Sequence, residues 1–307
     1  MTAADDPGTV EVLLSTYNGS RHLAEQLESL RVQTYPLVRL SVRDDGSTDA
    51  TVQVLRSGLT HFPGAKLEVG PNIGAARSFM TLLNGVAPAT RFAAFCDQDD
   101  VWAPEKLAAA AGALDGAAGP ALYCSAVNLV TDDLSALKPY RRCTRGVGFA
   151  NALVENIATG CTIVLNRAAV DLVNARSPKA LLMHDAWCYL VLSALGNVVY
   201  DPVPRVSYRV HSANAIGVAP TALGEWRRRA VNHRRHGRER ALTAQAAEFR
   251  RLYGEQLEVR TSAALDDFLG SSGSVFRRVR YSLTGAAYRQ RRLDDLVFRF
   301  LYLLGRI

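Results

Sequence analysis

The stretch RFAAFCDQDD at residues 91–100 places three acidic residues and a glutamine directly after an apolar run. The apolar part predicts a short buried strand, and the loop at its carboxyl end is where open α/β sheets bind ligands. Asp97 and Asp99, one residue apart, can turn toward the same point, and carboxylates this close repel one another unless they hold a cation. Hard oxygen ligands suit Mg²⁺ or Mn²⁺, which in turn bind a diphosphate. Taken alone, such a loop is more often a solvated turn in which Asp100 or a neighbour caps the next helix.

The N-terminal half repeats this order of strand, polar loop and helix. Strands are predicted at residues 10–15, 38–42 and 66–69, and helices behind Ser20 as N-cap, at about 49–56, at about 74–83 and after Pro104. This alternation is typical of a parallel sheet with crossover helices. The loops that carry Tyr17-Asn18, Asp44-Asp45 and Asp97–Asp100 should therefore converge at one edge of the sheet.

The second half is less regular. Strands are predicted at residues 122–130, 158–165, 198–200 and 206–210, and helices from 166 or 167 and over 186–195. From Thr221 the pattern is helical and rich in arginine, with a break at residues 271–274. We therefore expect a first domain at 1–220 and a helical extension at 221–307.

The basic charge of the chain is concentrated in this extension. The 307 residues are 48% hydrophobic, which is enough for a large core, and carry a formal net charge of +7. Residues 1–220 have 18 basic and 20 acidic side chains, a net of −2, whereas residues 221–307 have 18 arginines and 9 acidic side chains, a net of +9. Such a tail indicates an anionic partner: a membrane, a polyanionic acceptor or nucleic acid.

The cysteines and the chain start favour the cytosol. The five cysteines are scattered and form no C-x-x-C pair, which is typical of buried reduced thiols. The polar N-terminus is unlike a secretory signal. No run approaches the roughly 18 uninterrupted apolar residues of a spanning helix, so none is expected.

Seven short motifs occur in one order along the chain. They are STYNG at 15–19, RDDGSTD at 43–49, NIG at 72–74, FCDQDDVW at 95–102, TGC at 159–161, HDAW at 184–187 and YRVHSAN at 208–214. Together they resemble glycosyltransferase family 2 with the GT-A fold, over roughly residues 9–217. The resemblance implies a Rossmann-like, mostly parallel α/β sheet flanked by helices, here with a helical C-terminal extension.

The resemblance also assigns residues to a nucleoside diphosphate-sugar donor. Thr16 and Tyr17 would form the edge of the base slot, and Asp44 or Asp45 would accept the imide N–H of a pyrimidine. Arg77 would face the nucleotide. The alternative for Tyr17 is a core tyrosine, and the alternative for Asp44 and Asp45 is an ordinary turn before a capped helix. For Arg77 the alternative is a solvated helix arginine.

For the metal, Mg²⁺ or Mn²⁺, the resemblance favours direct contact from Asp99 and a contact of Asp97 with the ribose or a metal-bound water. His211 matches a late histidine that often completes the metal site of this family. A purely structural histidine is the alternative.

The catalytic position of the family falls on Asp185, which would act as general base on the acceptor hydroxyl. One base and a metal-stabilised leaving group imply a single displacement with inversion. The alternative role for Asp185 is an N-cap. His184 and Trp187 would shape the acceptor side, with Trp187 as a sugar-stacking surface.

The motif variants resemble those of bacterial rhamnosyltransferases of surface-polysaccharide and cell-wall assembly. This implies dTDP-rhamnose as donor and a glycan or lipid-linked acceptor, and leaves UDP-hexose or UDP-N-acetylhexosamine open. A nucleotidyltransferase would normally carry a more glycine-rich loop than Asn18-Gly19-Ser20. A non-catalytic protein that binds membrane or polyanions on a relic GT-A fold is the remaining class; nucleic acid is not the partner we favour.

The tail has two possible roles. Its apolar residues Leu293, Leu296, Val297, Phe300, Leu301 and Leu304 follow helical spacing, with most arginines off that stripe. The stripe either packs on the catalytic domain or lies on anionic lipid, helped by the cluster from Arg227 to Arg240. The second role would put a cytoplasmic enzyme at the inner face of the cell membrane.

Overall fold

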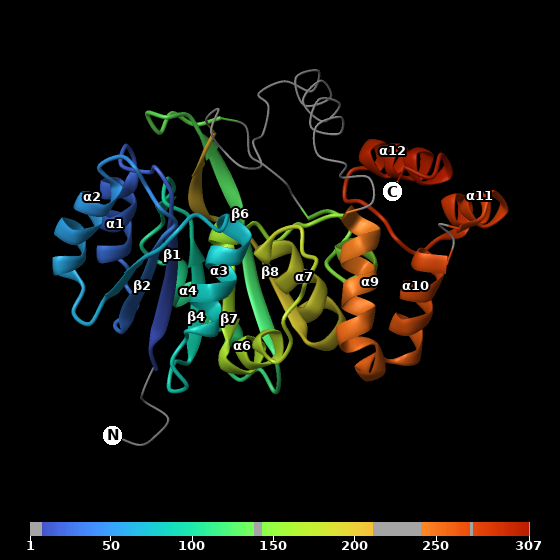
Figure 1. The fold of residues 1–307 in the computed structure, drawn as a ribbon, viewed down its shortest axis with the longest axis horizontal. Coiled ribbons are helices and arrows are strands. Elements are labelled where there is room, and N and C mark those ends of the chain that lie inside the picture. The colour runs from blue at the N-terminus through green and yellow to red at the C-terminus, as the bar shows by residue number, and fades with distance from the viewer. Residues whose placement is uncertain (1–7, 138–142, 211–240, 271–272, 307) are drawn as a thin grey trace.

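The computed structural model describes residues 8–137, 143–210, 241–270 and 273–306 (Figure 1). One eight-stranded sheet lies at its centre, in the order β3-β2-β1-β4-β7-β6-β8-β5. The strands are β1 Val10–Thr16, β2 Val38–Asp44, β3 Lys66–Val69, β4 Phe92–Cys96, β5 Val101–Trp102, β6 Ala121–Val130, β7 Val164–Asn166 and β8 Asn197–Arg209. Strands β1 to β4 pair in parallel, as do β6 and β8, whereas the pairs β4–β7, β6–β7 and β5–β8 are antiparallel.

The parallel half sets the edge at which the loops meet. β1 lies between β2 and β4 and is buried along its whole length. Its one charged residue, Glu11, accepts hydrogen bonds from the hydroxyls of Ser41 and Thr90. Thr16 pairs with Asp44, and Leu14 with Cys96, so the three strands end at nearly the same level. The predicted convergence of their loops follows from this register.

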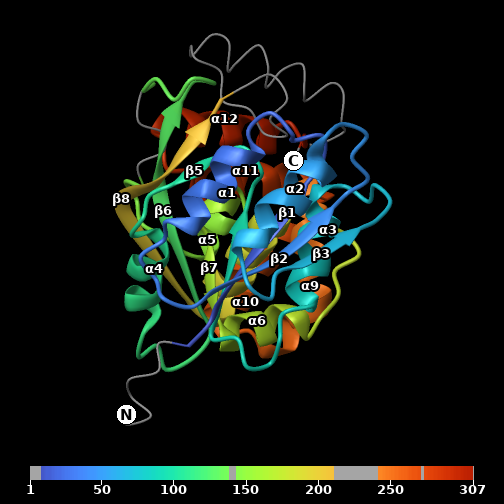
Figure 2. The same cartoon turned by 90° about the vertical axis from the view of Figure 1, so that its left-hand side faces the viewer.

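Two hydrophobic cores cover the two faces of the sheet. Successive residues of β1 alternate between them, with Leu13 in one core and Val12 and Leu14 in the other. The helices around the sheet are α1 Leu23–Arg31, α2 Thr51–Gly58, α3 Ala75–Asn84, α4 Lys106–Leu114, α5 Phe149–Ala152, α6 Arg167–Asn174 and α7 His184–Leu195. Residues of α1, α2 and α4 share a core with Leu14, and those of α3, α6 and α7 share the other with Leu13. This is the predicted α/β class (Figure 2).

Three local predictions need correction. Helix α1 begins at Leu23 with His22 as N-cap, because the Ser20 hydroxyl is engaged by Asp49 Oδ2 at 2.7 Å. The strand expected over 158–165 is mostly a 3₁₀ turn at Gly160–Thr162, and only the short β7 follows it. The two strands expected around Pro202 and Pro204 form one strand, β8, whose register against β6 shifts between Ser125 and Val127.

The C-terminal part consists of helices α9 Ala241–Tyr253, α10 Val259–Gly270, α11 Val275–Thr284 and α12 Arg292–Leu303. The break predicted at 271–274 separates α10 from α11. Helix α9 belongs to the same core as α7, through ring contacts of Phe249 and Tyr253 with Trp187. The expected domain boundary at 220 and the cluster from Arg227 to Arg240 lie outside the described residues. No helix in the described ranges is long and apolar enough to cross a membrane.

Candidate active site

Side-chain hydrogen bonds join the loops at the carboxyl edge of the sheet. The Tyr17 backbone N–H donates to Gln98 Oε1 at 2.8 Å, and Gln98 Nε2 donates back to the Tyr17 carbonyl at 3.1 Å. Asn18 N–H donates to Ser47 Oγ at 2.8 Å. The loop after β1 is thus tied to the loops after β2 and β4, as the strand register requires. The Tyr17 side chain is exposed beside this junction, so it is not a core tyrosine.

Asp44 and Asp45 are buried and organise the loops around them. Asp44 accepts hydrogen bonds from the Thr16 hydroxyl at 2.8 Å and from the Ser47 N–H and hydroxyl at 2.8 and 2.6 Å. Asp45 pairs with the Arg43 guanidinium and accepts the N–H groups of Ile73 and Gly74, at 2.9 and 2.8 Å. Both carboxylates therefore already hold protein donors, and their part in reading a base stays a prediction.

Two glycines with left-handed backbone lie in the loops that follow β2 and β3. Gly46 has φ +83°, and a Cβ there would meet the Asn72 nitrogen at 3.1 Å; Gly74 has φ +82° and precedes α3. Arg77 lies exposed on the first turn of that helix. An exposed position on the first turn of α3 is compatible with a contact to the nucleotide, and that contact stays a prediction.

The acidic loop gathers carboxylates from two distant parts of the sequence. Burial, followed by the negative charges of Asp99 and Asp185, raises the pKa of Asp97 to about 8. Asp185 belongs to the first turn of α7, so α7 and the loop after β4 bring their carboxylates within electrostatic reach of each other.

Asp100 and Cys161 complete this cluster and were not predicted as site residues. One ligand atom each from Asp97, Asp100 and Cys161 lies within 4.8 Å of the others. Burial, then the charges of Asp99 and Asp97, raise the pKa of Asp100 well above its usual range. Asp100 also accepts the Arg209 backbone N–H at 3.2 Å, so it has a structural role rather than that of a helix cap.

The side chains of this cluster suit a hard divalent cation whose ligands are carboxylate oxygens and not sulfur. Burial raises the pKa of the Cys161 thiol well above its usual range, so this side chain is a protonated hydrogen-bond donor to Asp100. Repelling carboxylates such as Asp97 and Asp99 suit Mg²⁺ or Mn²⁺. His211, the third predicted ligand, lies outside the described residues.

The buried side chain of Lys106 lies near the acidic loop. The Lys106 ammonium lies over the Trp102 ring, 3.1 Å from its centroid, and burial lowers the pKa of Lys106 to about 7. Its charge interacts with that of Asp100. Sequence reasoning missed Lys106, because it reads as an ordinary helix lysine.

The buried guanidinium of Arg209 anchors the carboxyl end of β8. The Arg209 side chain pairs with Glu25 on α1, contacts His22 Nδ1 at 2.5 Å and donates to the Asp132 carbonyl at 3.1 Å. Together with the bond from its backbone to Asp100, these contacts fix the end of β8 beside the acidic loop.

Asp185 is not an N-cap. The N-cap of α7 is Met183, and Asp185 Oδ1 accepts the N–H of Ala186 at 2.7 Å. The turn that holds Cys161 packs against it: a Cβ on Gly160 would meet His184 Nε2 at 3.1 Å and Asp185 Cβ at 3.6 Å. Only glycine fits this approach without displacing its neighbours, which explains the small residue between Thr159 and Cys161.

The expectations for His184 and Trp187 are wrong as stated. The His184 ring is buried between Phe79 and Phe95, with ring centroids 4.0 and 4.6 Å away, and burial lowers its pKa to about 3, so it is neutral. Trp187 is fully buried. Neither ring is available to a sugar, because the helix turns both toward the core and only Asp185 toward the acidic loop.

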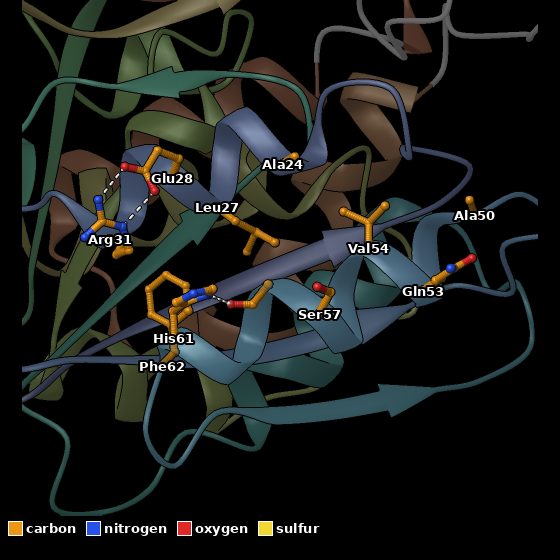
Figure 3. Close-up of a pocket in the computed structure, with 11 residues that line it drawn as sticks. Ala24, Leu27, Glu28, Arg31, Ala50, Gln53, Val54, Ser57, His61 and Phe62 are labelled. Carbon is orange, nitrogen blue, oxygen red and sulfur yellow. Dashed lines mark hydrogen bonds and ion pairs between the residues drawn. The ribbon is translucent and has the colours of Figure 1, made fainter.

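A surface hollow of about 520 Å³ lies away from these loops, between α1 and α2 (Figure 3). Its lining includes Leu27, Val54 and Phe62 and an ion pair in which Arg31 and Glu28 lie 2.6 Å apart. Among the residues that the structure describes, none of those predicted for donor, metal or acceptor lines this hollow. The candidate site is therefore the loop edge and not this cavity.

Comparison with known proteins agrees with this geometry. The sequence profile of glycosyl transferase family 2 matches residues 11–170. The dTDP-rhamnosyl transferase RfbG of Shigella flexneri is 23% identical over 227 residues, 70% of this chain and 77% of that protein. A UDP-Glc:alpha-D-GlcNAc-diphosphoundecaprenol beta-1,3-glucosyltransferase, WfgD of Escherichia coli, is 31% identical over 105 residues, 33% of this chain and 39% of that protein.

Two solved structures share the fold. S. aureus TarS in complex with UDP-GlcNAc superposes with a TM-score of 0.61 at 17% identity, over 97% of this chain and 81% of that one. The mannosyltransferase PcManGT of Pyrobaculum calidifontis, in complex with GDP-Man and Mn²⁺, superposes with a TM-score of 0.52 at 17% identity, over 98% of this chain and 87% of that one. At this level of identity the likeness is one of fold, and the expected GT-A architecture is confirmed.

Proposed function

Since the chain belongs to glycosyl transferase family 2, we propose that this glycosyltransferase works by inversion and with a divalent metal. Its donor is a nucleoside diphosphate-sugar, best taken as dTDP-L-rhamnose, and its acceptor is a hydroxyl of a glycan or lipid-linked sugar. The reaction belongs to the synthesis of a cell-surface polysaccharide, on the cytoplasmic side of the cell membrane.

The observation that carries this proposal is the meeting of Asp97 and Asp185. They are far apart in sequence, yet each contributes to one electrostatic cluster at the carboxyl edge of the sheet. In an open α/β sheet, this is the edge where ligands bind. A structural role alone gives no reason to bring the carboxyl groups of Asp97, Asp99 and Asp185 together.

Asp185 has the position of a general base. Its Oδ1 accepts the N–H of Ala186, which holds the carboxylate on the first turn of α7. Asp185 takes the proton of the acceptor hydroxyl while that oxygen bonds to the anomeric carbon. The bond from the anomeric carbon to the diphosphate oxygen breaks in the same step, so the configuration inverts.

Asp97 and Asp99, with His211, are the residues that would hold the cation. A bound Mg²⁺ or Mn²⁺ supplies Lewis-acid neutralisation of the charge that develops on the departing diphosphate. On the donor side, Thr16, Tyr17, Asp44, Asp45 and Arg77 are proposed to bind the nucleotide, and the bonds between Gln98 and Tyr17 link that region to the metal loop.

The choice of rhamnose is supported by the motif variants and by the similarity to the dTDP-rhamnosyl transferase of Shigella flexneri. The relatives that carry UDP-linked sugars in their names or structures keep UDP-hexose and UDP-N-acetylhexosamine as the second candidate. These donors differ in base and sugar and share the diphosphate, so binding experiments can separate them.

A thermal-shift screen with Mn²⁺ tests the donor. Because a ligand that binds only the native state raises apparent stability, dTDP-rhamnose should raise Tm more than UDP-glucose or UDP-N-acetylglucosamine. Hydrolysis of the donor that raises Tm most, with Mn²⁺ and with excess chelator, then tests the metal. Equal hydrolysis in chelator, or no shift with any nucleotide-sugar, would contradict the proposal.

A further inference from the structure

Exposed large apolar side chains are concentrated on the segment that holds helices α11 and α12. Sixteen large apolar side chains are exposed among the described residues, and half of them fall within residues 273–306. These eight are Val275, Phe276, Val279, Leu283, Leu293, Leu296, Phe300 and Leu304, here called the apolar tail face. Phe276, Leu283 and Leu293 are 81%, 77% and 72% exposed. Scattered exposed leucines are ordinary, whereas a contiguous cluster marks an interaction site.

The spacing gives each helix one continuous apolar stripe. On α11 the exposed residues Phe276, Val279 and Leu283 are three and then four positions apart. On α12, Leu293, Leu296 and Phe300 repeat the same spacing. Residues at these intervals lie above one another on a helix. The sequence alone allowed this stripe to pack on the catalytic domain; most of it faces away instead.

The opposite sides of the two helices are firmly packed. Tyr281, Phe298 and Tyr302 are buried, with the rings of Tyr281 and Tyr302 4.6 Å apart at their centroids. The Tyr302 hydroxyl donates to the Phe268 carbonyl of α10 at 2.5 Å, and Arg299 donates to the Ser282 carbonyl at 2.9 Å. The stripes are therefore the outer side of an ordered pair of helices.

The charge around the stripes is strongly positive. Residues 273–306 hold eight arginines and two aspartates, a net of +6. Five of the arginines are exposed: Arg277, Arg280, Arg291, Arg292 and Arg306. Of the two aspartates, Asp295 is already paired with Arg145 and Arg299.

This charge selects among the possible occupants of the apolar tail face. A second copy of the chain across a two-fold axis would set +6 against +6. The chain's own segment 211–240 has seven arginines and two glutamates, so it too carries positive charge. An anionic lipid bilayer offers what neither does: negative headgroups for the arginines and acyl chains for the apolar stripes.

We infer that α11 and α12 form a docking surface for an anionic membrane. The apolar tail face enters the boundary between headgroups and acyl chains, and the exposed arginines contact the phosphates. The surface holds the protein reversibly, since it lies on the bilayer and does not span it.

The position of these helices relative to the candidate site suits a lipid-linked acceptor. In Figures 1 and 2, α12 lies toward the end of the molecule at which the central strands have their carboxyl ends. For the acceptor, the inference rests on the proposed function; the membrane contact itself does not depend on turnover.

Flotation of the full-length protein with vesicles tests the surface. The vesicles are phosphatidylcholine mixed with phosphatidylglycerol, and phosphatidylcholine alone. One variant changes Phe276, Leu283, Leu296 and Phe300 to serine, and a second changes Arg277, Arg291, Arg292 and Arg306 to glutamine. The matched control changes Val32, Leu37 and Val203 to serine, which are exposed apolar residues outside the tail.

The wild type and the control should float with the mixed vesicles at low salt and not with phosphatidylcholine alone. Loss of four cations should lower the partition coefficient on the order of 10²-fold or more, and the serine variant should stay at the bottom. Both variants should keep the Tm of wild type and its hydrolysis of soluble donor. A serine variant that floats like wild type would overturn the inference.

Two further outcomes would also overturn it. One is a full-length protein that ignores mixed vesicles at low salt. The other is a wild-type protein that ignores vesicles and forms dimers that the serine variant abolishes, since the occupant would then be a second copy. Vesicle binding without donor hydrolysis would instead refute the proposed function and leave the membrane surface standing.

Discussion

The acidic edge of the sheet and the apolar tail face depart from ordinary side-chain placement in opposite directions. At the edge, Asp97 and Asp100 lie close together, and burial is the main cause of their raised pKa values. On the tail, Phe276 and Phe300 are exposed, although Tyr281 and Phe298 on the same two helices are buried. The first region concentrates carboxylates that we propose to hold a cation, and the second concentrates apolar surface that we propose to contact a bilayer. The comparison teaches that the chemical type of an unusually placed side chain indicates the type of ligand: buried carboxyl groups indicate a cation, and exposed apolar side chains indicate an apolar partner.

The largest expected effect concerns the charge at the edge. Asp99→Ala should abolish transfer with little change in Tm, because it removes a proposed metal ligand from a loop held by other residues. Single-turnover transfer and thermal unfolding measure the two effects. Asp171→Ala, an exposed carboxylate paired with Arg167 on α6, is the matched control. Near-normal transfer by Asp99→Ala would show that the edge does not work through a metal.

Asp185→Asn should lower the rate of transfer by about 10²–10⁴-fold, the usual effect of losing a general base. The amide keeps an oxygen that can accept the Ala186 N–H, so helix α7 and donor binding should persist. Donor affinity from titration calorimetry, set against kcat, separates the two roles. Full turnover in this variant would reduce Asp185 to a structural residue.

The two sides of α12 should respond differently to the same change. Phe298→Ala should lower the free energy of unfolding by about 3–5 kcal/mol, because Phe298 is buried in the core. The centroids of the Phe298 and Tyr302 rings are 5.8 Å apart. Phe300→Ala, two residues on and exposed, should cost less than about 0.5 kcal/mol. Urea unfolding compares them directly. Similar costs for both would mean that the apolar tail face is covered in solution.

The smallest expected effect is a change in the pH dependence of stability. The pKa of His184 falls from 6.5 to about 3 on folding, because the ring is buried. Below about pH 6.5 the unfolded chain therefore binds a proton that the folded protein does not, and stability is lost as the pH falls toward 3. The slope from this residue approaches about 1.4 kcal/mol per pH unit.

Urea unfolding at a series of pH values measures this slope. His184→Leu should be less stable near neutral pH yet lose less stability on acidification than wild type. His61→Leu, a change at an exposed histidine, should retain the wild-type slope. Equal slopes in wild type and His184→Leu would show that His184 is not held neutral by the core.

The parallel half of the fold was the easiest part to predict. Strand β3 begins and ends at the predicted residues, and β1 and β2 differ from prediction by only one or two residues at their carboxyl ends. Because parallel strands end at one edge, the convergence of Tyr17, Asp44 and Asp97 followed from order alone. The late strands were predicted less well, since the turn at Gly160 and the irregular β8 depend on contacts with His184 and β6.

The sequence by itself determined the α/β architecture, the family motifs and the excess of arginine in the tail, because these depend on local periodicity, order and composition. Tertiary structure alone decided which side chains face which surroundings. It turned Trp187 into the core, brought Cys161 and Lys106 beneath Asp100, and left Phe300 in solvent. An apolar helical stripe looks the same in the sequence whether or not a neighbouring helix covers it. Periodicity shows that the helix has an apolar face, and the packing of distant segments decides what that face contacts.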